Sequence, residues 1–280
     1  MYSATILADS VSKNGHRLTT MEIVFPRIAL ADFNTHRVFS RNSSSSRAIP
    51  VEKLLEKVRT NPFVPDYLGA NQPGMSADNE LTGDARQAAI DEWLKARDDA
   101  VAHAEKLVEI GLHKQLTNRL IEAFTWHTVI VTASEWENFF ALRANPDAQP
   151  ELRRVAELMK DAYRTSIPTP LEDDQWHLPL LQDDEQDWAT ENIEDAIKVC
   201  CGRSARVSYL THDGKRDHAK DIELYDRLTE GGHMSPLEHV ARPMTNEELE
   251  AGEWSGNFRG WHQHRKDVIH EDNFAEVGKN

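Results

Sequence analysis

The segment from Asn34 to Arg47 constrains most strongly what this chain can fold into. It contains three arginines, one histidine and five serines but no carboxylate. Only Val38 and Phe39 are apolar and could help to build a core. The whole chain, by contrast, carries a formal net charge of −15. A cationic segment in an acidic protein indicates a small phosphorylated ligand and argues against a nucleic-acid polymer as partner.

The rest of the composition indicates one enzyme-sized unit. With 280 residues, of which 39% are hydrophobic, the chain can bury a substantial core, and we expect a single domain over residues 1–280. No apolar run approaches the ~20 residues that cross a bilayer, and the first residues do not resemble a secretion signal. The two cysteines, Cys200 and Cys201, are adjacent, which fits a reducing compartment. We therefore expect a cytoplasmic protein without a membrane partner.

The residue pattern predicts an α+β fold with an antiparallel sheet and long helices. Two strands are expected at 3–10 and 17–30, joined by a turn at Asn14-Gly15, and a third strand at 125–132. Helices are expected from Pro50, at 85–110, at 113–123, after a Ser134 cap, at 149–164, from Ile193 to Cys200 and at 221–228. One or two further strands are expected in 254–270. Strands and helices do not alternate as in a βαβ protein, which is why we expect α+β.

Two stretches are predicted to be irregular. Residues 60–84 are rich in Pro, Gly, Asn and Asp, which indicates a loop long enough to serve a function. Residues 165–187 contain two prolines and a run of carboxylates, and we interpret them as an acidic linker.

Residues Ser43 to Arg47 are the first candidate site. A phosphate is bound by backbone N–H groups, hydroxyl donors and, best of all, a forked guanidinium. The serines supply hydroxyls on a backbone that can curl around an anion, and Arg47 supplies the fork. A solvated loop is the alternative, since serine runs usually are solvated. The strand before the segment and the helix from Pro50 after it favour binding.

Arg143 is the second candidate. It follows Trp136, Phe139 and Phe140 at helical spacing, so it shares a face with three aromatic rings. A cation on an apolar face needs a partner, which would indicate a binding role. Alternatively, Arg143 extends to water from the last helical turn. Spacing alone leaves both possibilities open.

The turn from Gly231 to His239 is the third candidate, because it places His233, Ser235, Glu238 and His239 close together. A metal site is conceivable, but the His-x5-His spacing is uncommon among metal ligands, so polar turn residues or contacts to an organic cofactor are favoured. Cys200 falls on an apolar helix face and is expected to be inert. Neither a P-loop nor a Rossmann glycine pattern is present.

Three segments together resemble the flavin-dependent thymidylate synthases. His36-Arg37, followed by Ser40, Asn42, Ser45 and Arg47, resembles the Arg-His-Arg signature of that family. The run Asn138-Phe-Phe-Ala-Leu-Arg143, with Ala148-Gln149 and Glu151-Leu-Arg153 after it, is similar to the second signature. Ala205-Arg-Val-Ser-Tyr209 and Gly232-His-Met-Ser-Pro-Leu-Glu-His239 are similar to the third.

The order of these segments differs from that of the family, in which the third signature precedes the Arg-His-Arg strand. The chain therefore resembles a circularly permuted member, with 165–187 joining the ancestral ends. Permutation is tolerated where the original ends lie close together at the surface. We expect Ser235 to lie near His36 and Arg37 if this interpretation holds.

The resemblance implies a role for each matching residue. Contacts to FAD would come from His36, Arg37, Asn138, His233, Ser235 and Glu238. The nucleotide would be held by Ser43, Ser45, Arg47, Arg119 and Arg143, although the Arg119 match requires a gap. Arg143 would lie against the pyrimidine and favour its N3-ionised form. The implied reaction transfers a one-carbon unit from methylenetetrahydrofolate to C5 of dUMP, with NADPH as reductant, in a homotetramer whose subunits share sites.

Three departures from the family leave the substrate open. Thr35 replaces the first arginine of the triplet, Ser43 stands where a glutamate is usual, and Thr132 stands where an asparagine is usual. A hydroxymethylase acting on dUMP or dCMP is therefore an alternative. A non-catalytic nucleotide-binding homologue is another.

Overall fold

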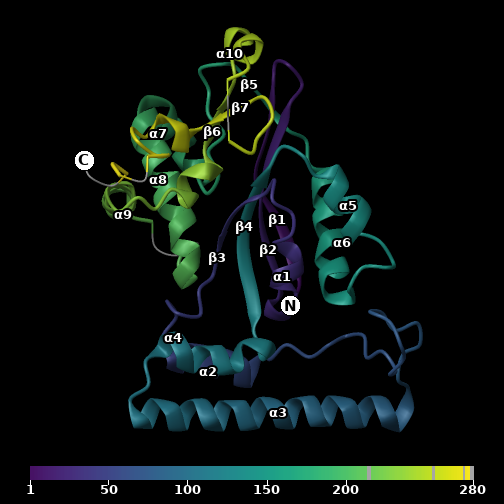
Figure 1. Ribbon diagram of the computed structural model, residues 1–280. Helices are drawn as coiled ribbons and strands as arrows, with labels where there is room; N and C mark the ends of the chain where they lie inside the picture. Colours follow the sequence, from purple (N-terminus) through teal and green to yellow (C-terminus); the bar gives the residue numbers. More distant parts are fainter. Residues whose placement is uncertain (213–215, 254–255, 274, 278–280) are drawn as a thin grey trace.

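The computed structural model describes residues 1–212, 216–253, 256–273 and 275–277. Its central sheet has the strand order β3-β4-β2-β1-β5 (Figure 1). The five strands are β1 (Ser3–Ser12), β2 (Arg17–Pro26), β3 (Ser40–Ser43), β4 (Trp126–Ala133) and β5 (Thr169–Leu171). Neighbouring strands are antiparallel except β1 and β5, which are parallel. This sheet and the long helices around it confirm the α+β prediction.

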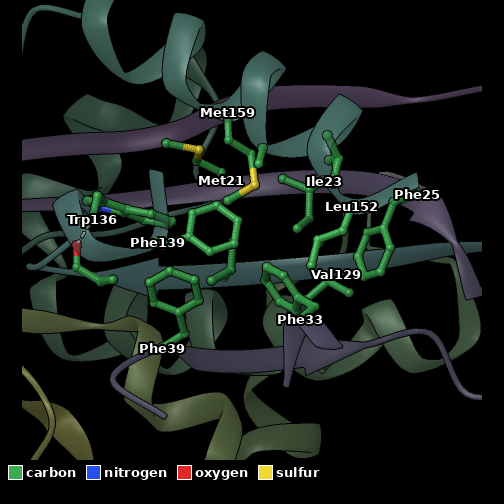
Figure 2. Packing of buried hydrophobic residues seen from close by; sticks show 14 of the residues in the cluster. Met21, Ile23, Phe25, Phe33, Phe39, Val129, Trp136, Phe139, Leu152 and Met159 are labelled. Atoms are coloured by element: carbon green, nitrogen blue, oxygen red, sulfur yellow. Dashed lines mark hydrogen bonds between the residues drawn. The ribbon is translucent and has the colours of Figure 1, made fainter. Parts of the chain in front are cut away.

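One face of the sheet is apolar and is covered by helices α5 (Glu137–Arg143) and α6 (Pro150–Thr165). Met21, Ile23 and Phe25 point to this face because side chains alternate along β2. Figure 2 shows how they pack against Phe139 of α5, Leu152 and Met159 of α6, and Phe33 of α1 (Leu30–Phe33). The indole of Trp136 donates to the Ala133 carbonyl at 3.0 Å, which fixes the start of α5 to the end of β4.

The opposite face of the sheet is covered by the C-terminal half of the chain. Its main elements are α8 (Ile193–Arg206), α9 (His218–Glu230) and the short 3-10 helix η5 (Ser235–His239). The smaller elements are η3 (Asp183–Glu185), α7 (Gln186–Glu191), η4 (Val207–Tyr209), β6 (Ala241–Pro243), α10 (Asn246–Ala251), β7 (Trp261–Gln263) and η6 (His264–Asp267). Strands β6 and β7 form a separate antiparallel pair. The predicted strand region 254–270 is thus confirmed for β7, while residues 254 and 255 lie outside the described residues.

A third group of helices lies at the foot of the sheet in Figure 1. It comprises α2 (Val51–Thr60), α3 (Gly83–Ile110), α4 (Lys114–Thr117) and the 3-10 helix η2 (Asn118–Phe124). These helices share their own core, built around Leu54, Val101 and Ile121. The loop between α2 and α3 contains a bridge between Gly69 and Glu80, and within it the Tyr67 hydroxyl donates to the Ala77 carbonyl at 2.8 Å.

Several predicted boundaries need correction. The second strand ends at Pro26 rather than at residue 30, and η1 (Arg27–Ala29) follows it. The expected helix at 113–123 is a short α4 continued by η2, and the N-cap of α5 is Trp136 rather than Ser134. Residues 165–187 are more than a linker, because they contain β5, η3 and the start of α7. Ser40–Ser43 of the cationic segment form a strand that was not predicted, since they pair with β4.

Within the described residues, none of the helices combines the length and the apolar composition that crossing a bilayer requires.

Candidate functional site

Arg143 and His36 meet at the C-terminal end of α5. The Arg143 Nε donates to His36 Nε2 at 3.0 Å, and a second guanidinium nitrogen donates to the Thr35 hydroxyl at 3.2 Å. The His36 ring also packs edge-on against Phe139, with ring centroids 4.9 Å apart. Arg143 therefore has a binding partner, and the partner is the histidine of the first motif.

The protonation state of His36 follows from this contact. Burial lowers the pKa of His36, and the nearby guanidiniums of Arg143 and Arg41 lower it further. The ring is therefore neutral at pH 7, and Nε2 carries the lone pair that accepts from Arg143. Because neither His36 nor Thr35 is anionic, the contact leaves the positive charge of Arg143 uncompensated.

A cleft of about 390 Å³ lies next to these residues, between the segment leading into β3 and the C-terminal segment. It is lined by Arg37, Phe39, Arg41, Glu238, Gly256, Asn257, Gln263, Arg265 and Lys266. Four of these side chains are cationic and one is a carboxylate. Glu271 offsets part of the charge, because it pairs with Arg265 at 2.8 Å and with Lys266 at 2.5 Å. The cleft nevertheless keeps a surplus of positive charge in an acidic protein.

The third motif reaches this cleft through η5, which packs on β3. Glu238 lines the cleft and pairs with Arg265 at 2.6 Å. His233 and Ser235 are exposed, whereas His239 is completely buried. The expectation that the turn presents all four side chains together is therefore wrong for His239, which points into the protein. The segments around His36–Arg37 and Ser235–Glu238, far apart in sequence, do meet.

The residues assigned to the phosphate lie beyond the other end of β3. Ser43 is the last residue of β3, and the Ser45 amide donates to the Ser208 carbonyl at 3.0 Å. Arg47 is exposed. Arg119 pairs with Glu122 at 3.3 Å, and the same carboxylate accepts from the Ser46 hydroxyl at 2.5 Å. The chain thus brings Arg143 to the first motif, but β3 separates Arg143 from Arg47.

The other residues singled out in the sequence do not line this cleft. Asn138 is exposed on α5, on the side away from the apolar core. Cys200 and Cys201 are completely buried, and burial raises the pKa of both thiols. This confirms the interpretation of Cys200 as inert packing and shows that Cys201 is no more accessible. Among the described residues, no three His, Cys, Asp or Glu side chains gather in an arrangement that could hold a metal ion.

Five polar residues of the cleft were missed from the sequence: Arg41, Asn257, Gln263, Arg265 and Lys266. Arg41 lies inside the cationic segment and could have been found there. Arg265 and Lys266 are adjacent cations after a short strand, which is a weak signal, because only the fold brings them opposite Arg37.

A family profile covers the part of the chain that contains the first two motifs. The sequence profile of the thymidylate synthase complementing protein family (Thy1) matches residues 12–169. Two structures of PolB from Streptomyces cacaoi, described as a UMP/dUMP methylase, are each similar over 58% of this chain. The complex with 5-Br UMP has 18% sequence identity to this chain, is covered over 88% of its own length and has a TM-score of 0.48. The complex with 5-Br dUMP has 17% sequence identity, is covered over 90% of its own length and has a TM-score of 0.49. No curated protein sequence matches. Because the profile match spans more than half of the residues, the chain belongs to the thymidylate synthase complementing protein family, which is the family of the flavin-dependent thymidylate synthases.

Proposed function

We propose that this protein transfers a one-carbon unit from methylenetetrahydrofolate to C5 of dUMP with FAD as cofactor and NADPH as reductant. The family membership supports the reaction class. The observation that carries the proposal is the bond between Arg143 and His36, because it joins the residue expected at the pyrimidine to the residue expected at the flavin.

The cleft beside this pair fits the diphosphate end of FAD in its chemistry. Arg37 and Arg41 stand on one side, and Arg265 and Lys266 on the other. Guanidinium and ammonium groups are the side chains that hold phosphate oxygens most strongly. We propose that these four residues, with Glu238, bind the cofactor. When bound, FAD supplies the reducing equivalents that convert the transferred methylene into a methyl group.

The role of Arg143 follows from its neutral partners. An arginine that pairs with a carboxylate, as Arg203 does with Glu185, has part of its charge neutralised. Arg143 instead donates to an imidazole and a hydroxyl, so its full charge can stabilise a pyrimidine that has lost its N3 proton. The negative charge raises electron density at C5, and C5 can then attack the folate-borne carbon without a cysteine adduct. The inert, buried thiols of Cys200 and Cys201 are consistent with this route.

We propose that a second subunit completes the nucleotide site. Arg143 contacts His36 before β3 and Arg47 follows the end of β3, and we propose that different subunits supply these two residues to one nucleotide. The neighbouring Leu142 is 54% exposed, which supports a contact surface beside Arg143. The assembly would be a homotetramer in the cytoplasm, in keeping with the two free cysteines.

The permuted chain order is part of the same proposal. The family match ends at residue 169, whereas the third motif begins at Ala205. In the fold this late motif packs on β3, beside the first motif. Residues 165–187 then form the connection between the ancestral ends, and β5 pairs it to β1.

The experiment combines a spectrum with a product mass. The protein is incubated with FAD, a reductant, methylenetetrahydrofolate and either dUMP or dCMP. We expect a flavin absorption spectrum that stays with the protein, and a product heavier than dUMP by one CH₂ group. Failure to retain FAD together with unchanged nucleotides would contradict the proposal and would indicate a non-catalytic binding protein.

The second candidate is a hydroxymethylase on the same scaffold. It is favoured by the departures at Thr35, Ser43 and Thr132, because Ser43 and Thr132 lie on β3 and β4 and the Thr35 hydroxyl accepts from Arg143. A product heavier by CH₂O from dUMP or dCMP would select this alternative.

A further inference from the structure

A continuous line of buried polar side chains crosses the polar face of the main sheet. Its five contacts are Ser10 Oγ to His177 Nδ1 (2.8 Å), His177 Nε2 to Thr20 Oγ1 (2.7 Å), Thr20 Oγ1 to Thr132 Oγ1 (2.7 Å), Thr132 Oγ1 to His239 Nδ1 (2.8 Å) and His239 Nε2 to the Asn42 amide (3.2 Å). All six residues are buried. The line links four strands to the 165–187 segment and to η5.

The orientation of the Asn42 amide sets the direction of this line. One end of the amide faces the Ser235 and Arg41 carbonyls, each at 3.1 Å. Carbonyl oxygens can only accept, so this end must be the NH₂ group. The same nitrogen lies 3.2 Å from His239 Nε2. His239 Nε2 therefore carries a lone pair, and its proton must sit on Nδ1.

The remaining contacts follow in order. His239 Nδ1–H donates to the Thr132 hydroxyl, which can then donate to Thr20. Thr20 donates to His177 Nε2, so that ring also carries its proton on Nδ1 and donates it to Ser10. Each hydroxyl and each ring has one donor and one acceptor in the required place, the Asn42 NH₂ divides its two hydrogens among three acceptors, and the bonds all run from Asn42 to Ser10. Burial lowers the pKa of both histidines to about 3, which keeps both rings neutral as this arrangement requires.

We propose that Thr132 and His239 are positioning residues, which orient the Asn42 amide through this directed line and thereby hold the Ser235–His239 turn against the cofactor cleft. Asn42 is the only member that contacts the turn through a main-chain carbonyl, that of Ser235. Glu238, three residues later, lines the cleft. Thr132 is also one of the departures from the family pattern, and in this chain its hydroxyl is the central link. The expected effect on FAD binding rests on the proposed function, whereas the expected effect on the position of the Ser235–His239 turn does not.

The first test is the tautomer of the two histidines in the wild-type protein. Long-range ¹H–¹⁵N NMR spectra distinguish Nδ1–H from Nε2–H imidazoles without any ligand or variant. We expect His177 and His239 to be neutral at pH 7, with the proton on Nδ1 in both. A proton on Nε2 of His239 would overturn the proposal.

The second test compares Thr132→Val with Thr132→Ser. Valine keeps the shape and removes the hydroxyl, whereas serine keeps the hydroxyl. The Leu237 amide donates to the Met234 carbonyl within the turn, and in Thr132→Val we expect its hydrogen to exchange faster with solvent. We also expect FAD to bind about tenfold more weakly, which is the scale of one lost buried hydrogen bond. Thr132→Ser should stay within about twofold of wild type in both measurements, well inside the same scale. Unchanged exchange in a folded Thr132→Val protein would refute the positioning role.

The two readouts separate this inference from the proposed function. If the wild-type protein fails to bind FAD, the proposed function falls, and the tautomers and the exchange of the Leu237 amide still decide whether the line positions the turn.

Discussion

Arg143 differs from the buried arginine Arg203 in the charge of its partners. Arg203 is buried between Glu185, at 2.7 Å, and Asp221, at 3.1 Å, so its charge is neutralised. Among the described residues, the Arg143 side chain bonds to the lone pair of a neutral imidazole and to a hydroxyl oxygen. Arg143 is half-buried, so a ligand can reach its unneutralised charge, and this is why we place the pyrimidine at Arg143.

Replacing Arg143 with alanine tests this role. The variant should lose product formation because the N3-ionised pyrimidine is no longer stabilised, while FAD stays bound through the separate cleft. Product formation is followed by mass spectrometry and flavin retention by absorbance. Arg164→Ala is a matched control, since Arg164 is exposed near the end of α6, lies outside the three motifs and should be silent. Turnover retained in Arg143→Ala would show that the pyrimidine is activated in another way.

The second prediction for a single residue concerns Arg47. Its guanidinium is exposed, and we expect it to hold the phosphate of the nucleotide. Arg47→Ala should weaken nucleotide binding by about 1.5–3 kcal/mol, the range for a hydrogen bond to a charged group. Calorimetric titration measures the change, with Arg59→Ala, on the exposed side of α2, as control. Equal affinities for Arg47→Ala and wild type would remove Arg47 from the site.

Among the elements, α8 and α9 make a close contact that depends on a glycine. A side chain on Gly202 would collide with the backbone of Asp221, near the start of α9. The close approach lets Arg203 and Arg206 both reach the Asp221 carboxylate, at 3.1 and 2.6 Å. This network holds α9 in place, and α9 leads into the turn that reaches the cleft.

Gly202→Ala should therefore destabilise the fold although alanine favours helices. We expect a loss of about 1–3 kcal/mol, typical of overpacking in a tight contact. Urea denaturation followed by circular dichroism measures it. Glu194→Ala, on the exposed side of the same helix, should change stability by less than about 0.5 kcal/mol. A neutral or stabilising Gly202→Ala would mean that the two helices can separate without loss.

The elements that the sequence predicted are those with strong periodicity. The apolar stripes of α3 and α6 and the alternation in β4 were sufficient, because these patterns decide which face is buried. Strand β3, with the sequence Ser-Arg-Asn-Ser, lacks the residues that favour strands and forms because β4 offers an edge to pair with. The three-residue β5 contains Pro170, which is tolerated because β5 is an edge strand. Such elements are set by tertiary contacts and could not be predicted locally.

The same limit applies to the site. The sequence identified Arg143 as a cation in need of a partner, but its partner His36 is 107 positions away. The motif resemblance supplied His36 and Arg37, and the fold added Arg265 and Lys266 from the C-terminal segment. The polar line across the sheet could not be predicted, because its members come from six separate segments.

At the scale of the whole molecule, buried neutral histidines make stability depend on pH. Burial lowers the pKa of His127, His177 and His239 to about 3. The same side chains titrate near pH 6.5 when unfolded, so below that pH the unfolded chain binds more protons than the folded one. Their contribution to stability is complete above about pH 6.5 and decreases as the pH falls towards about 3.

Urea denaturation between pH 6.5 and 5 should show this directly, above the range in which the carboxylates titrate. Stability should decrease with falling pH, at most by about 1.4 kcal/mol per pH unit for each buried histidine. His127→Gln should reduce the slope of the free energy of unfolding against pH by the contribution of one histidine. His103→Gln, at an exposed position on α3, should leave this slope unchanged. A flat profile over this range would show that the three rings take up protons in the fold as readily as in the unfolded chain.

The central claim is that this protein replaces the hydrogen on C5 of dUMP with a carbon from folate. The most direct measurement is the release of tritium to water from dUMP labelled at C5, in the presence of FAD, a reductant and methylenetetrahydrofolate. We predict release that requires FAD and the folate and is lost in Arg143→Ala. If the label stays on the pyrimidine under all these conditions, C5 is not the reacting atom and the account is contradicted.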